Sequence, residues 1–496
     1  MALSSISGSA PSSIYQMIDQ YMQIEQRPRD ELVSKKKALY DKKSVFSEMD
    51  SILSALKTKA DYLSDTIFNP FLAKSGTSSN PDVLGITVKS SAVTGNHEIT
   101  VDRLAKADTR VSDQYNDSDS SFSSFSTDQT FTIEVGHPTD TDANNRVQIS
   151  VTVGADAFSG TNDTVLQAIA DAVNTAMSQA VGDETINSDE VIHASVVNEE
   201  RGTSRLVFRS ENTGYTYRMD FGSSPLLDAL NINNNALSSG TTGGYVTPIG
   251  SSATDSELNA QFTMDGLAFY RDSNTVSDAI DGITLKLLNT FSTTETVTVT
   301  TDTDTIKEDI QDFIDKYNDA IDFIRKNTRM DPDTHKEAPI AHDYTYRAIT
   351  TDLRSIAGSE VSGTTNPDYN LLYDIGIEAD QEGKLSISDS TKLIDALEAN
   401  PEFVSDLFTG ENGIATKIKE YIDNFVKAGG TIDQSKKLID NQVTRLDDRI
   451  KDMNELLDKK EKQYFDQFSK LQQTMAMLQN QQAIFSSFMS GGQGTS

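Results

Sequence analysis

Histidines are the residues of this chain whose chemistry most readily suggests catalysis or metal binding. They are His97, His137, His193, His335 and His342. None lies in an HExxH motif or pairs with a nucleophilic serine in a known motif. His335 and His342 stand among aspartates, as metal ligands do, but two prolines in the same segment favour an exposed loop. We therefore expect solvated loop residues there and no metal site.

Residues 378–389 copy part of the spacing of a calcium-binding loop. Such a loop begins with Asp and ends, in its twelfth place, with a Glu that binds through both oxygens. This segment instead has Glu378 first and Asp389 last. Strand-like residues flank it, where a calcium loop has two helices. We predict a β-hairpin that turns at 380–384.

No other catalytic signature is present. The chain has no cysteine, which excludes a thiolate nucleophile, a thiolate metal site and a disulfide. P-loop, GxGxxG and GxSxG motifs are missing. With 75 acidic residues, a pair of carboxylates arises easily by chance. The sequence predicts no enzyme, no catalytic residue and no cofactor.

The composition also restricts the partners. Lys and Arg number 43 against 75 Asp and Glu, a net charge of −32, which argues against a nucleic-acid surface. No apolar run reaches the roughly 18 residues of a membrane span, so we expect no membrane insertion. The first 13 residues lack the basic and apolar regions of a cleaved signal peptide. Export would need another route.

Both ends of the chain carry the seven-residue repeat of a coiled coil. The N-terminal repeat runs through Leu32, Leu39, Phe46, Leu53, Ala60 and Ile67. It predicts a helix over 28–67, with Pro28 in the first turn, where proline costs no hydrogen bond. At 1.5 Å per residue this helix is roughly 60 Å long, a rod rather than part of a globule.

The C-terminal repeat continues past a lysine, Lys460, in its seam, and shifts phase between Tyr464 and Phe468, as a stutter does. Its seam residues are Ile439, Val443, Leu446, Ile450, Met453, Leu457, Tyr464, Phe468, Leu471, Met475, Leu478 and Phe485. A helix cannot bury such a stripe alone. Its partner is either the N-terminal helix of the same chain or another subunit, and the sequence leaves both open.

Charge separates the ends from the middle. Residues 75–430 carry a net charge of −33, whereas residues 1–74 carry +1 and residues 431–496 are neutral. No charged side chain follows Lys470. We expect this uncharged, amide-rich terminus to pack against copies of itself or against neighbours.

From about residue 75 to residue 305, apolar and polar residues alternate in runs that are rich in β-branched residues. Turn-forming residues separate these runs. This predicts antiparallel strands, interrupted by one helix over 163–180 and by long loops at 113–129 and 231–252. Further helices are expected over 306–321, 346–355, 390–399 and 413–428.

The predicted fold class is α+β and multidomain: a helical coiled-coil leg from both termini, with antiparallel β-rich head domains inserted between the helices. The expected parts are an N-terminal flexible or assembly segment (1–30), a helical leg domain (31–74 with 306–430), a β-rich head domain (75–107 with 246–305), an inserted outer head domain with one helix (108–245) and a C-terminal coiled-coil and assembly segment (431–496).

Several segments resemble flagellar filament cap proteins, the hook-associated proteins of the distal tip. The most specific resembles the family's F-x-x-D-G…S-N-x-x-x-D-x-I-x-G-x-T-L pattern. Its residues here are Phe262, Asp265, Gly266, Ser273, Asn274, Asp278, Ile280, Gly282, Thr284 and Leu285. Segments 15–53, 79–112, 373–408 and 464–488 are also similar. In 163–215, Val173 replaces the usual Ile of a repeat shared among flagellar hook and filament proteins.

The resemblance implies a secreted, homo-oligomeric ring at the tip of the bacterial flagellum, exported through the type III channel, that helps flagellin subunits fold and insert. The implied partners are other copies, flagellin, hook-associated proteins and an export chaperone. The seam residues of the terminal repeats would then be the assembly residues. A hook–filament junction protein or flagellin-like axial component remains the nearest alternative, and an adhesin that binds host glycans through the head is another.

Overall fold

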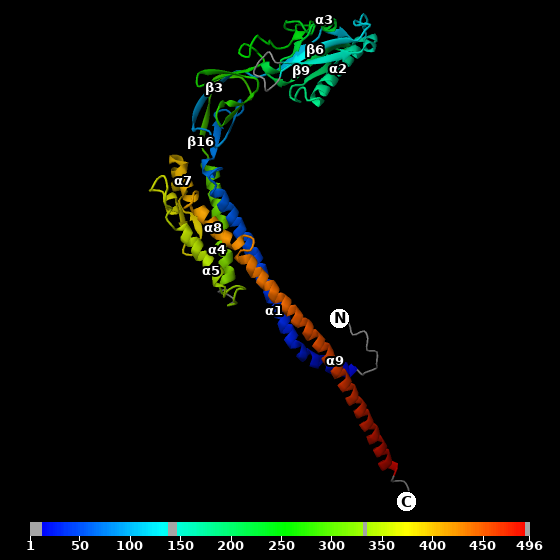
Figure 1. Cartoon of the computed structure of the whole chain (residues 1–496), viewed down its shortest axis with the longest axis vertical. Helices are drawn as coiled ribbons and strands as arrows, with labels where there is room; N and C mark the ends of the chain where they lie inside the picture. The colour runs from blue at the N-terminus through cyan, green and yellow to red at the C-terminus, as the bar shows by residue number, and fades with distance from the viewer. Residues whose placement is uncertain (1–11, 137–145, 331–334, 492–496) are drawn as a thin grey trace. The chain divides into compact units, whose positions relative to one another are not determined.

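The structure is a computed structural model, and it describes residues 12–136, 146–330 and 335–491 (Figure 1). The chain divides into two compact units. Leu72–Asp302 forms one unit, and Met1–Phe71 together with Thr303–Ser496 forms the other. The first is rich in strands and the second in helices, so the prediction of an α+β multidomain fold is confirmed. The finer division into five parts stays a prediction.

The helical unit is built around its longest helices. Its helices are α1 (Ser12–Leu63), α4 (Thr303–Thr328), α5 (Tyr344–Ala357), α6 (Ser390–Ala399), α7 (Pro401–Phe408), α8 (Ile414–Val426) and α9 (Thr431–Gly491). Helix α1 packs against α9, α8 and α4. Its stripe is buried at Phe46, Leu53 and Ala60, and the ring of Phe46 lies 4.9 Å from that of Tyr346 in α5. The partner of the N-terminal repeat is therefore largely the same chain.

Helix α1 differs from its prediction at both ends. It begins at Ser12, not at Pro28, which lies inside the helix. Ile18 and Met22 are buried on the N-terminal side of Pro28, and this burial offsets the backbone hydrogen bond that proline removes. Residues 12–30 are thus part of a helix, while the assembly role expected for residues 1–30 stays a prediction and residues 1–11 lie outside the described part. The helix ends at Leu63, and Ile67 is exposed.

The four shorter helices expected after residue 305 are all present, as α4, α5, α6 and α8. Helix α7 was not predicted, because it has only 8 residues and shows too little of a periodic stripe. Its start does follow a sequence signal. Pro401 occupies the first turn, and the side chain of Asn400 accepts the backbone N–H of Glu402 at 2.9 Å.

The strand-rich unit has two parts, one formed by both ends of its sequence and one inserted between them. The first part has β1 (Lys74–Ser78), β2 (Leu84–Val88), β3 (Gly95–Arg103), β12 (Ala260–Met264), β13 (Leu267–Arg271), β14 (Thr275–Ile280), β15 (Ile283–Leu287) and β16 (Phe291–Thr301). They pair antiparallel in the orders β1-β16-β3-β12-β13 and β14-β15-β2. Apolar residues from both sheets form one buried cluster, which includes Ile99, Val101, Phe262 and Leu285.

The second part is inserted between β3 and β12. Its strands are β4 (Ala107–Val111), β5 (Tyr115–Asn116), β6 (Gln129–Val135), β7 (Val147–Val153), β8 (Ile192–Val197), β9 (Thr203–Thr213), β10 (Asp220–Phe221) and β11 (Gly244–Tyr245), and its helices are α2 (Asn162–Gly182) and α3 (Pro225–Leu230). Helix α2 packs on β7, β8 and β9. Its predicted apolar face is buried at Val165, Ile169, Val173 and Met177, as the periodicity indicated.

The residues that carry the family resemblance hold this fold together. Asp265 and Gly266 have φ of 52° and 81° and form the two-residue turn between β12 and β13. The amide of Asn274 accepts the N–H of Ala105 at 2.7 Å and donates to its carbonyl at 3.0 Å. Gly282 has φ of 75°, and a Cβ there would lie 2.7 Å from the backbone nitrogen of Ala92. We find an architectural role for each of these residues.

Candidate assembly surface

The C-terminal repeat lies on α9, and most of its length packs antiparallel along α1. The direction follows from the ion pairs between the two helices. As the residue number increases along α1, the residue number of the partner in α9 decreases. The pairs are Glu25–Lys460, Lys36–Asp447, Lys43–Asp440 and Asp50–Lys436. Lys36 and Lys43, like Asp447 and Asp440, are seven residues apart. The charges therefore follow the same repeat as the apolar seam and fix the pairing of the helices.

The structure separates the predicted seam residues into three groups by exposure. The buried ones are Leu32, Phe46, Leu53, Ile439, Val443 and Leu457. The half-buried ones are Leu39, Leu446, Ile450, Met453, Tyr464 and Phe468. The exposed ones are Leu471, Met475, Leu478 and Phe485. In α9, the predicted seam residues beyond Phe468 are therefore all exposed.

The lysine that interrupts the seam has a partner in α1. Lys460 pairs with Glu25, and the hydroxyl of Tyr464 donates to the same carboxylate at 2.8 Å. The hydrogen bond from Lys460, followed by that from Tyr464, lowers the pKa of Glu25. The same contact raises the pKa of Lys460. A charged residue is tolerated in the seam because an opposite charge meets it from the neighbouring helix.

A small apolar cluster closes this end of the helix pair. Ile18, Met22 and Leu457 are buried together, with Tyr464 and Phe468 packed against them. The ring of Tyr21 lies 5.7 Å from that of Tyr464 and 5.8 Å from that of Phe468. The α1 side of this cluster is not among the residues predicted from the repeats. The signal was available as the apolar spacing of Ile14, Ile18 and Met22, four residues apart.

Beyond Phe468 the helix continues past the start of α1. Figure 1 shows the C-terminal end of α9, in red, extending beyond the N-terminal end of α1. The apolar side chains here are 52% to 68% exposed: Leu471, Met475, Met477, Leu478, Ile484 and Phe485. We name this part, residues 471–487, the distal segment. Residues 431–468 of the same helix are the proximal segment.

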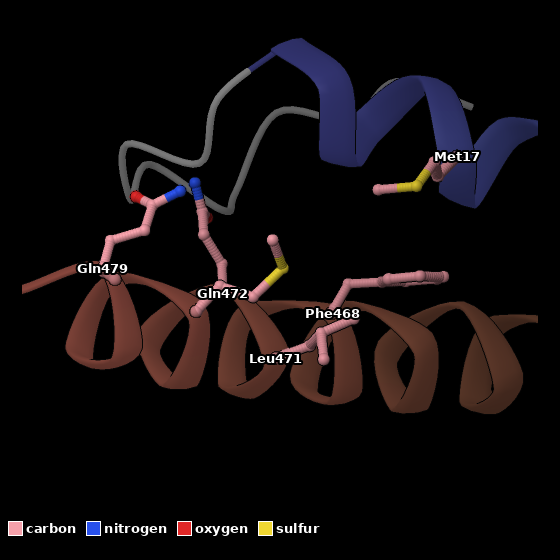
Figure 2. Close-up of a pocket in the computed structure, with 7 residues that line it drawn as sticks. Met17, Phe468, Leu471, Gln472 and Gln479 are labelled. Atoms are coloured by element: carbon pink, nitrogen blue, oxygen red, sulfur yellow. The ribbon is translucent and has the colours of Figure 1, made fainter. Parts of the chain in front are cut away.

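A hollow of about 390 Å³ lies where α1 begins, between Met17 and the distal segment. Figure 2 shows Met17 reaching from α1 toward Phe468, while Gln472 and Gln479 rise from α9 on the same side. Leu471 and Met475 contribute its apolar floor. The hollow marks the place where the cover supplied by α1 ends.

The residues considered for metal binding are used otherwise. Residues 377–387 form the predicted hairpin of β17 (Ile377–Ala379) and β18 (Leu385–Ile387), and the carboxylate of Asp380 accepts the N–H groups of Glu382 and Lys384. His342 is exposed and contacts Glu337. His137, Asp331 and Asp333 lie outside the described residues.

Two kinds of feature are absent from the described residues, 12–136, 146–330 and 335–491. These residues contain no group of three or more His, Asp or Glu placed to hold a metal ion. None of their helices has both the length and the apolar character needed to cross a bilayer.

Comparison with known proteins gives matches at both ends of the chain. A family model described as flagellar hook-associated protein 2 N-terminus matches residues 12–108, and the model of the C-terminus matches residues 258–480. The B-type flagellar hook-associated protein 2 of Pseudomonas aeruginosa is 27% identical over 433 residues, which cover 84% of this chain and 81% of that protein. The flagellar hook-associated protein 2 of Salmonella typhimurium is 30% identical over 331 residues, covering 64% and 65%.

A solved structure extends the likeness to the fold. The D1-D2-D3 domains of the flagellar cap protein FliD from Escherichia coli align with a TM-score of 0.59 at 27% identity, covering 80% of this chain and 99% of that one. The two family models flank the inserted part of the strand-rich unit and include α1 and most of α9. The chain belongs to the family of flagellar hook-associated protein 2.

Proposed function

We propose that this chain is a subunit of the cap at the distal end of the bacterial flagellar filament, where it promotes the folding and insertion of flagellin. Membership of the family supports this proposal over a hook–filament junction protein, a flagellin-like component or a glycan-binding adhesin. The observation in this chain that carries it is the distal segment, an uncharged helix with exposed apolar side chains. Such a surface fits a subunit that completes its packing only in an assembly.

The proposed partners are other copies of the chain in a ring, flagellin and the hook-associated proteins, with an export chaperone before secretion. The proposed location is outside the cell, at the flagellar tip. The seam residues act in two ways in this proposal. The buried and half-buried ones hold α1 and α9 together, and the exposed ones, Leu471 to Phe485, are available to the assembly.

Imaging of the purified full chain by negative-stain electron microscopy tests the ring. We expect plate-like rings of a few subunits, and particles that are all single elongated chains would contradict the proposal. A truncation that removes residues 472–496 tests the role of the distal segment. We expect a folded protein that no longer supports filament growth in the bacterium that makes it, and normal motility would refute that role.

A further inference from the structure

The distal segment has a second apolar seam beside the one that continues from the proximal segment. Seam one contains Leu471, Met475, Leu478, Gln482 and Phe485, and it continues the stripe that α1 covers as far as Phe468. Seam two contains Met477 and Ile484, which are seven residues apart. All of these apolar side chains are more than half exposed. A second seam is unnecessary for a pair of helices and allows each helix to contact two neighbours.

The angle between the seams follows from helix geometry. At 3.6 residues per turn, successive side chains are about 100° apart, which places the centres of the two seams about 130° apart. Thr474 and Gln481 lie on the narrower side between them, and Ala476 and Ala483 lie on the wider side. Helices joined through two seams at such an angle close into a ring. The side chains between the seams, here polar ones, then face its centre.

The chemistry of the segment identifies the neighbours as copies of this chain. A cyclic oligomer gives each subunit two neighbours through one heterologous interface, so two different surfaces must fit each other. Copies related by rotation are parallel and in register. Met477 of one copy and Leu478 of the next therefore lie at nearly the same level along the helix axes. No charged side chain follows Lys470, so identical segments approach without repulsion. Gln482 is the one polar residue in seam one, and such a residue specifies register.

We propose that the distal segments of neighbouring copies associate as a ring of parallel helices, in which seam one of each copy packs against seam two of the next. This proposal rests on the proposed function, since it needs a cyclic assembly. It adds the partner of the distal segment and the residues that meet.

The chain has no cysteine, so cysteines introduced into the full-length protein test the proposal by disulfide cross-linking with diamide. Mixing the single variants Met477→Cys and Leu478→Cys should give a mixed dimer in greater yield than either variant gives alone. The double variant Met477→Cys/Leu478→Cys should give a ladder of linked oligomers that ends at the subunit number. The matched control is Ala476→Cys/Ala483→Cys, on the wide side between the seams, which should give no ladder.

Four outcomes would overturn the proposal. Efficient self-linking of Leu478→Cys, with nothing larger than a dimer from the double variant, would show two-stranded pairs. An equal ladder from the control would show unspecific contact. Sedimentation of the reduced proteins separates this proposal from the proposed function. Oligomers without a ladder would refute the helical ring alone, whereas monomers throughout would refute the cyclic assembly on which both proposals rest.

Discussion

The proximal and distal segments of α9 share a seven-residue repeat but differ in what surrounds it. The proximal segment has charged residues beside its seam, and four ion pairs join it to α1. The distal segment has no charge, and its Leu and Phe side chains face solvent. This difference shows that the seven-residue repeat alone does not identify the helix that packs against it. The charges beside the seam select α1 for one segment, and their absence leaves the other open to copies of itself.

A matched pair of leucines gives the largest expected difference between the segments. Leu457 and Leu478 lie three heptads apart on the same helix, one buried and the other 58% exposed. Leu457→Ala should lower the free energy of unfolding by about 2–5 kcal/mol, because it removes buried methyl groups and leaves a cavity. Leu478→Ala should change it by no more than about 0.5 kcal/mol in the monomer. Denaturant unfolding followed by circular dichroism measures both, and equal effects would contradict the comparison.

Replacing the proline inside α1 should strengthen the proximal pairing. Pro28→Ala restores a backbone hydrogen bond to Ile24 and removes a steric clash, and we expect a gain of about 1–3 kcal/mol. In hydrogen-exchange measurements, backbone amides near residue 24 should exchange more slowly in Pro28→Ala than in the wild type. Arg27→Ala, at the exposed neighbouring position, serves as the control. A loss of stability in Pro28→Ala would mean that the helix pair needs the local geometry that proline imposes.

Acid should weaken the proximal segment and leave the distal segment unchanged. The pKa of Glu25 is lowered by its hydrogen bonds with Lys460 and Tyr464. A lowered carboxyl pKa contributes stability above the ordinary value of 4.5, and this contribution is lost as the pH falls through the folded-state value. Between pH 7 and pH 3 the thermal midpoint of the wild type should therefore fall more than that of Glu25→Gln. Parallel curves for the two proteins would refute a role for this carboxylate.

A charge exchange gives the smallest effect and tests whether the ion pairs select the partner. Lys43→Glu places two acidic groups together, and the double variant Lys43→Glu/Asp440→Lys restores an opposite pair. We expect the single change to cost about 0.2–1 kcal/mol, as is usual for an exposed pair, and the double variant to recover most of it. Thermal unfolding at low salt measures the difference. No recovery in the double variant would indicate that other contacts set the pairing.

Much of the fold could be predicted from local patterns, and the misses have physical causes. The period-two runs gave the strands, and the stripe at Val165 to Met177 gave α2 with its buried face. The predicted start of α1 lies 16 residues too late, because proline is typical of the first turn of a helix. Only the packing of Ile18 and Met22 on Leu457 makes a proline acceptable inside the helix. Glu25 was missed for the same reason, since its partner Lys460 is 435 residues away.

The sequence by itself determined the elements, the division of charge and the positions of the seam residues, because periodicity and composition are local properties. It also carried the resemblance to the cap family, through residues such as Asn274 and Gly282, whose contacts with the backbone only the fold shows. Only the tertiary structure decided which seam residues are covered. That outcome depends on where α1 begins relative to α9, and a helix that is 61 residues long extends past a partner of 52.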